Sequence, residues 1–250
     1  MSFLNKFGIG IGTGTGTGRE VSRPIPQNGR TRNVAPVPAV GASRPPEAPG
    51  STRVSNGLKE LLWNLDGLGR GTLLDLGPAW QTTLSFFIER GFRVSSEDIL
   101  REWKDFLSEE EVRLHQPGVV SDAVDMTPTG RAARFLESNL QYPRASFDAV
   151  LVWDLLDYLE PALAKQAIAS LTELLRPGGV VFALFHSKKP EGFQRYRIAD
   201  SNSLQIISAT VLCPAQKVYQ NREIQDLFNR FRTTKSFVSR DQLRETLFIK

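Results

Sequence analysis

Five short segments of the chain carry residue types that could bind a ligand or transfer a proton. They are Asp75-Leu-Gly-Pro-Ala79, Glu97-Asp98, Asn139-Leu140, Asp154-Leu155 and His186. Carboxylates accept hydrogen bonds from hydroxyl and ammonium groups, and a glycine such as Gly77 lets the backbone turn tightly against a ligand. A histidine near such groups can act as a general base. If each segment follows a strand, all five would meet at one edge of a sheet.

The elements that would position these segments alternate between strands and helices. Strands are predicted over 72–76, 92–95, 133–136, 147–153 and 180–185, of which the first and the last two are mostly apolar. Helices are predicted over 58–65, 82–90, 99–114, 161–175 and 221–231. A loop over 115–131, a hairpin over 195–207 that turns at Ser201-Asn202, and strands over 235–238 and 246–250 complete the pattern. This alternation predicts an α/β fold with a doubly wound, mostly parallel sheet of seven strands, whose ligands bind beyond the carboxyl ends of the strands.

Residues 1–55 differ in composition from residues 56–250. They contain nine Gly and seven Pro but no Trp or Tyr, and glycine occupies every second position from Gly8 to Gly18. That spacing does not match GxGxxG, so a phosphate-binding loop is not indicated. A segment of this kind buries too little apolar surface to offset its chain entropy. We therefore expect a disordered tail over 1–55 and one folded domain over 56–250.

The net charge of +4 and the pI of about 9.3 come from this tail. Residues 1–55 carry a net charge of +5, whereas residues 56–250 carry −1. A basic tail can make weak electrostatic contact with nucleic acid, so we expect any such contact to depend on these residues. The folded domain is close to neutral, so the excess basic charge lies in the tail.

Cysteine, histidine and hydropathy exclude several classes of protein. Cys213 is the single cysteine, and His115 and His186 are the only histidines, so neither an internal disulfide nor a cysteine- or histidine-rich metal site is expected. The longest apolar runs are too short to cross a bilayer, and the first residues do not resemble a secretory signal. We expect no membrane partner and a cytoplasmic location.

Three motifs, in this order, resemble those of class I S-adenosylmethionine-dependent methyltransferases. Leu73-Leu-Asp-Leu-Gly77 resembles the first motif of the family. Residues 146–159 resemble the block around the fourth strand, and Leu175-Arg-Pro-Gly-Gly-Val-Val-Phe182 resembles the turn into the fifth. The resemblance covers residues 56–250. It implies a Rossmann-like fold, S-adenosylmethionine as the cofactor and methyl transfer to an acceptor that the sequence does not identify.

The resemblance also implies roles for individual residues. Asp75 would interact with the cationic methionine end of the cofactor, and Gly77 and Ala79 would line its path. Glu97 or Asp98 would accept hydrogen bonds from the ribose hydroxyls. Asn139 and Leu140 would flank the adenine, and Asp154 and Leu155 would lie beside the methyl-donor end. Residues 186–220 would form the acceptor side.

Other interpretations remain open from the sequence. His186 and Asp154 are the candidates for proton transfer, although a lone histidine is more often a hydrogen-bonded structural residue. Glu97 and Asp98 also suit a helix N-terminus. The family usually has glycines where this chain has Ala79 and Gln81, and the bulky Trp80 lies between them. A methyltransferase-like protein that has lost catalysis and binds a protein partner is therefore the alternative, ahead of a nucleotide-dependent oxidoreductase.

Overall fold

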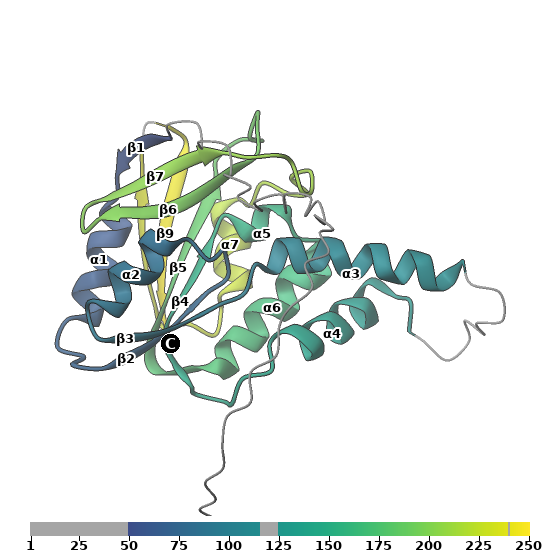
Figure 1. The fold of residues 1–250 in the computed structure, drawn as a ribbon, viewed down its shortest axis with the longest axis horizontal. Coiled ribbons are helices and arrows are strands. Elements are labelled where there is room, and N and C mark those ends of the chain that lie inside the picture. The colour runs from purple at the N-terminus through teal and green to yellow at the C-terminus, as the bar shows by residue number, and fades with distance from the viewer. Residues whose placement is uncertain (1–49, 116–124, 240) are drawn as a thin grey trace, which may run out of the picture. The chain divides into compact units, whose positions relative to one another are not determined.

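The computed structural model describes residues 50–115, 125–239 and 241–250 (Figure 1). The disordered tail predicted for residues 1–55 lies largely outside these ranges, as does the middle of the loop predicted over 115–131. Within them, the main sheet has six strands in the order β3-β2-β4-β5-β9-β8. A second sheet has three strands in the order β1-β7-β6.

Four strands of the main sheet are parallel. They are β3 (Phe92–Ser96), β2 (Gly71–Asp75), β4 (Phe147–Trp153) and β5 (Leu175–His186). β9 (Leu243–Ile249) pairs antiparallel with β5, and β8 (Thr233–Val238) pairs antiparallel with β9. The prediction of a doubly wound, mostly parallel α/β sheet is confirmed. The predicted number of seven strands is wrong, because the described sheet has six.

The missing strand is the one predicted over residues 133–136, which lie inside α4 (Pro128–Asn139). The Thr127 side chain caps this helix by accepting a hydrogen bond from the Gly130 amide, and proline is favoured in the first turn. Ala132, Phe135 and Leu136 are its buried residues. Their spacing of three and four residues places them on one helical face. The segment 133–136 is therefore helical, and β3 is an edge strand.

Helices cover both faces of the main sheet. α1 (Asn56–Leu65) and α2 (Gln81–Ile88) pack on one face, where Leu58, Leu61 and Phe87 join the apolar cluster. α3 (Ile99–Leu114), α4, α6 (Pro161–Leu174) and α7 (Asn221–Leu227) contribute to the cluster on the other face. α3 and α4 run side by side beyond the sheet, as Figure 1 shows, and edge-on contact of Trp103 with Phe135 helps to join them.

The small sheet begins earlier in the chain than the predicted domain boundary. β1 (Ser51–Val54) lies in the segment assigned to the tail, yet it pairs antiparallel with β7 (Ser203–Ser208). β7 forms the predicted hairpin with β6 (Gln194–Asp200). Arg53 in β1 makes an ion pair of 2.6 Å with the buried Glu245 of β9, which joins the two sheets. Residues 51–55 are thus part of the fold.

None of the helices within the described residues is both long enough and apolar enough to cross a membrane.

Candidate functional site

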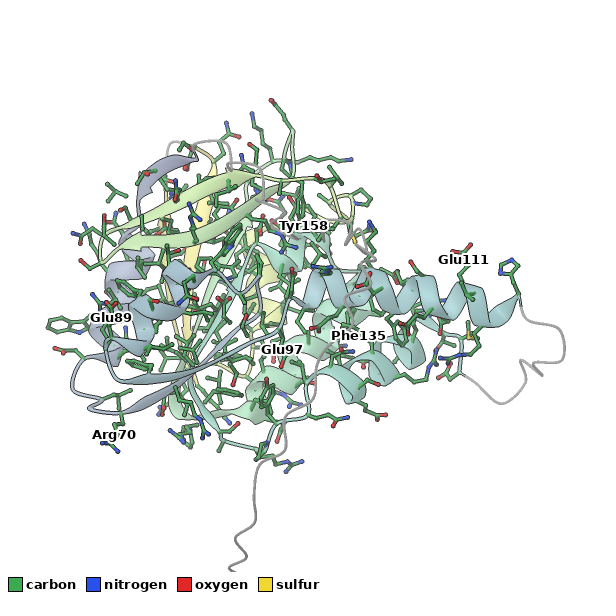
Figure 2. The ribbon with its side chains drawn as sticks, viewed as in Figure 1. Arg70, Glu89, Glu97, Glu111, Phe135 and Tyr158 are labelled. Carbon is green, nitrogen blue, oxygen red and sulfur yellow. The ribbon has the colours of Figure 1, made fainter. Side chains whose placement is uncertain are left out.

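The carboxyl ends of the parallel strands define the candidate site. Asp75 ends β2, Glu97 follows β3, Asp154 follows β4 and His186 ends β5. The chain passes from β2 through α2 on one face of the sheet to β3. It then passes from β3 through α3 and α4 on the other face to β4, which lies on the opposite side of β2. The end of β2 is therefore the point where the strand order reverses, the usual ligand site of such sheets. Figure 2 shows Glu97 and Tyr158 toward the middle of the molecule, with Arg70 and Glu89 at its periphery.

Asp75 is fully buried at this point. Its Oδ1 accepts hydrogen bonds from the Gly77 amide at 3.0 Å and from Trp153 Nε1 at 2.6 Å. Within the described residues, its Oδ2 has no hydrogen-bond partner. Burial raises the pKa of Asp75 to about 6, although both hydrogen bonds favour the charged form. A buried carboxylate with a free oxygen is suited to receive a cationic or hydrogen-bonding group.

The indole of Trp153 occupies the space beside Asp75 and Gly77. A Cβ atom on Gly77 would lie 2.8 Å from Trp153 Cδ1, so this glycine permits the close approach of the indole. Trp153 has a φ of 54°, which is rare for a bulky residue. Its ring stacks on Tyr196 of β6, with 6.3 Å between the ring centroids. The sequence motif singles out Gly77 but contains no sign that Trp153 fills this position.

The remaining cavity at the site is very small. It has a volume of about 10 Å³ and is lined by residues that include Gly77, Trp153, Asp154, Leu155 and Arg195. That is roughly the space that one water molecule needs, whereas small-molecule sites usually measure about 300 Å³ or more. S-adenosylmethionine therefore does not fit the crevice in this conformation, and Asp154 is the one expected carboxylate among the residues that line it.

Glu97 and Asp98 make different contacts. Glu97 accepts a hydrogen bond from the Tyr142 hydroxyl, and burial together with this contact raises the pKa of Tyr142 to about 12. Burial and the neighbouring Glu97 and Asp98 raise the pKa of Glu102 to about 7. Asp98 precedes α3 and makes an ion pair of 3.1 Å with Arg195 of β6. Asp98 thus anchors the hairpin to the main domain.

His186 lies between two buried carboxylates. Its Nδ1 is 2.9 Å from Asp157 Oδ2, which also accepts a hydrogen bond from the His186 amide at 2.8 Å. Its Nε2 lies 3.9 Å from Asp154 Oδ2. The hydrogen bond to Asp157 and both carboxylates raise the pKa of His186 against the opposing effect of burial. Burial raises the pKa of Asp154 to about 7. The arrangement favours a protonated imidazole that links α5 (Leu155–Tyr158) to β5.

The other residues predicted for the site lie apart from the cavity. Ala79 is exposed, and Trp80 precedes α2 without lining the cavity. Asn139 ends α4 and donates a hydrogen bond to the Phe135 carbonyl, whereas Leu140 packs in the core. These two residues were expected beyond a strand, and the structure places them beyond a helix instead.

Several residues that make contacts at the site were not predicted from the sequence. They are Trp153, Arg195, Tyr142 and Asp157, the last of which the sequence suggests only as a helix-start residue. Only Asp157 could have been predicted from the sequence, because it follows Asp154 by three residues and lies on the same short helical turn. The partners of the other three residues come from distant parts of the chain.

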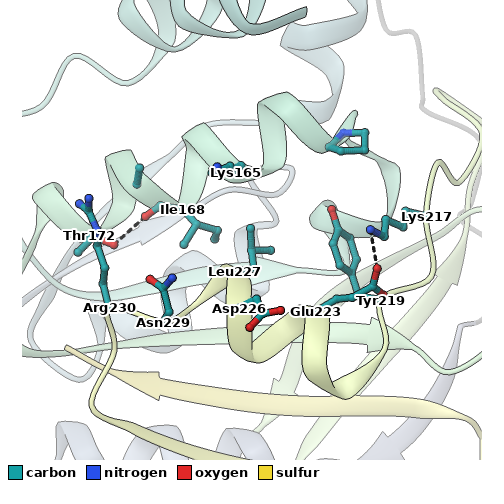
Figure 3. A pocket seen from close by; sticks show the side chains of 12 residues that line it. Lys165, Ile168, Thr172, Lys217, Tyr219, Glu223, Asp226, Leu227, Asn229 and Arg230 are labelled. Atoms are coloured by element: carbon teal, nitrogen blue, oxygen red, sulfur yellow. Dashed lines mark hydrogen bonds and ion pairs between the residues drawn. The ribbon is translucent and has the colours of Figure 1, made fainter.

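A larger hollow lies away from the strand ends. It has a volume of about 500 Å³ between α6 and α7, with Ile168, Tyr219 and Leu227 among its lining residues (Figure 3). Lys217 and Tyr219 line it and belong to the segment 186–220 that was expected on the acceptor side, whereas none of the residues expected to contact the cofactor does. Among the described residues, no group of three or more His, Cys, Asp or Glu side chains could hold a metal ion.

Comparison with known proteins gives matches among solved structures only. No protein-family model matches the chain, and no curated protein sequence matches it. The solved structures include a 1,6-didemethyltoxoflavin-N1-methyltransferase from Burkholderia thailandensis with bound 1,6-didemethyltoxoflavin and S-adenosylhomocysteine. It is 16% identical, with 78% of each chain covered and a TM-score of 0.40.

Two further solved structures are S-adenosylmethionine-dependent methyltransferases. The protein from Mesorhizobium loti is 13% identical, with 76% of this chain and 96% of that chain covered and a TM-score of 0.41. The protein from Methanosarcina mazei is 14% identical, with 72% and 92% covered and a TM-score of 0.37.

Proposed function

We propose that the chain is an S-adenosylmethionine-dependent methyltransferase that acts on an acceptor still to be identified. The observation that carries this proposal is the buried Asp75, which ends β2 where the strand order reverses and whose Oδ2 has no partner among the described residues. Glu97 follows the adjacent parallel strand. In an opened crevice, Asp75 would face the cationic end of the cofactor and Glu97 would accept hydrogen bonds from its ribose hydroxyls.

His186 has a structural role in this proposal. A general base needs a free nitrogen close to the proton that it removes. One nitrogen of His186 is bonded to Asp157, the other faces Asp154, and its raised pKa favours the protonated ring. Methyl transfer from a sulfonium depends mainly on alignment, so the proposed reaction does not require His186 to act as a base.

Calorimetric titration of the full chain with S-adenosylmethionine and S-adenosylhomocysteine tests the proposal. We expect binding by the wild-type chain, with affinity at least about tenfold lower in Asp75→Asn and in Glu97→Gln. Asp105→Asn on the exposed side of α3 is the matched control and should bind as the wild type does. The absence of binding in the wild type and also in variants with an opened crevice, described below, would refute the proposal.

The second candidate function is a methyltransferase-like protein without catalysis that binds a protein partner. The filling of the crevice by Trp153 and its closure by the Asp98–Arg195 ion pair favour it. The same titrations separate the two functions, because this candidate predicts no cofactor binding even when the crevice is opened.

The basic tail supports a separate proposal of weak, salt-dependent contact with nucleic acid. Since β1 starts at Ser51, the deletion that tests it should remove residues 1–49 and leave the small sheet intact. Binding to DNA should then fall to background. Unchanged binding would contradict the proposal.

A cytoplasmic location also remains a proposal, and the free Cys213 is compatible with a reducing compartment.

A further inference from the structure

Trp153 places a hydrogen-bond donor of this chain at the carboxylate where the cationic end of the proposed cofactor would bind. Trp153 Nε1 donates to Asp75 Oδ1 at 2.6 Å, the carboxylate proposed to receive the cationic end of the cofactor. The indole also lies so close to Gly77 that a single methyl group there would collide with it. Within the described residues Asp75 keeps Oδ2 free, but the indole fills the space beside Gly77 that the cofactor would occupy, so the two cannot occupy that space at once.

The conformation of Trp153 depends on its surroundings. Its φ of 54° is unfavourable for a side chain of this size, and such conformations persist only when neighbouring contacts impose them. Those contacts are the stacked Tyr196 ring of β6 and the edge-on Phe182 ring of β5. Tyr196 belongs to the hairpin, so a movement of the hairpin would free one side of the indole.

Two polar contacts hold the hairpin β6–β7 over this edge. Arg195 makes the ion pair with Asp98, and the Ile198 amide donates to Thr83 Oγ1 of α2 at 3.1 Å. On its other side, β7 is paired with β1, and β1 is fixed to the main sheet by the Arg53–Glu245 ion pair. The hairpin is thus held at β1 by strand pairing, and at the crevice by these polar contacts together with the burial of Tyr196 and Ile198 in the apolar cluster.

We propose that the crevice is gated: Trp153 occupies the cofactor position at Asp75 and Gly77, and the hairpin β6–β7 keeps it there through Arg195. The cofactor then binds only to the form in which the hairpin and indole have moved away. This inference rests on the proposed function, and it reconciles the cavity of about 10 Å³ with a cofactor of ordinary size. The affinity that is measured is lowered by the small fraction of open molecules.

Two variants of the full chain open the gate by different routes. Arg195→Gln removes the charge that pairs with Asp98 and keeps a side chain of similar length. Trp153→Gly removes the indole and suits the positive φ. Arg101→Gln is the control, because Arg101 is an exposed arginine of α3 whose side chain is 72% exposed. Hydrogen–deuterium exchange over residues 194–208 reports the opening independently of any ligand.

We expect faster exchange over 194–208 in Arg195→Gln, together with about tenfold tighter binding of S-adenosylhomocysteine in both opening variants. The control should match the wild type in both measurements. If the wild type binds and both variants bind equally or more weakly, the gate is refuted and the proposed function stands. If exchange in Arg195→Gln equals that of the wild type, the ion pair does not hold the hairpin and the gate is refuted. If exchange rises but no chain binds the ligand, the proposed function is refuted, and the gate with it.

Discussion

Replacing Asp154 by Asn should change how the stability of the protein depends on pH. Asp154 is buried, and one of its carboxylate oxygens has no hydrogen-bond partner among the described residues. Burial raises its pKa from 3.8 to about 7 against the opposing attraction of His186. Asn has nearly the same shape and no charge, so the substitution removes the ionisation and little else.

The sign follows from the raised pKa. The folded chain holds the Asp154 proton more tightly than the unfolded chain does, so the free energy of unfolding falls as the pH rises from about 4 to about 7. A pKa that is higher by one corresponds to about 1.4 kcal/mol in favour of the protonated form, so the upper limit of the loss at pH 8 is about 4 kcal/mol. We expect Asp154→Asn to match the wild type near pH 4 and to be more stable at pH 8.

Urea unfolding of the full chain, followed by circular dichroism between pH 4 and pH 9, measures this difference. Asp105→Asn is the control, because the side chain of Asp105 is 66% exposed, and its profile should run parallel to that of the wild type. The reasoning is refuted if the profile of Asp154→Asn is also parallel to the wild-type profile, or if this variant is less stable at pH 8.

Two further predictions concern other buried charges. Glu245→Gln should lower the free energy of unfolding by about 1 to 2 kcal/mol, because it leaves the buried Arg53 with only the more exposed Asp241 as a charged partner; an unchanged free energy in urea unfolding would contradict this. His186 has a raised pKa, so the stability that it contributes is present below its unfolded pKa of about 6.5 and is lost as the pH rises above it. The stability advantage of the wild type over His186→Gln should therefore be larger at pH 5.5 than at pH 8.5, and an advantage that grows with pH would disprove the assignment.

The sheet could be predicted largely because its central strands are continuous apolar runs. Residues 147–153 and 180–185 are buried on both faces of the sheet, and such strands show no alternation with polar residues. The short run over 133–136 misled the prediction because a run of only four residues suits a strand or a helix equally well. The wider spacing of Ala132, Phe135 and Leu136 distinguishes the two, since it follows one helical face.

The candidate site was predicted only in part. Chain order and strand ends are enough to bring Asp75, Glu97, Asp154 and His186 to one edge. The filling of the crevice could not be predicted, because it depends on the positive φ of Trp153 and on a hairpin that comes later in the chain and folds back over that edge. A sequence pattern specifies neither the direction of a side chain nor whether a segment later in the chain will pack over the site.

The placement of β2 beside β4 has a consequence for the kinetics of folding. Thr72, near the start of β2, donates a hydrogen bond to Asp148 of β4, which lies 76 residues later in the chain. A contact of this kind cannot form until a long loop has closed, and proteins dominated by such contacts fold slowly, on the order of milliseconds to seconds. During that interval the apolar strand β4 lacks its neighbour β2 and exposes that edge. Low temperature and low protein concentration during refolding should therefore increase the yield of native protein.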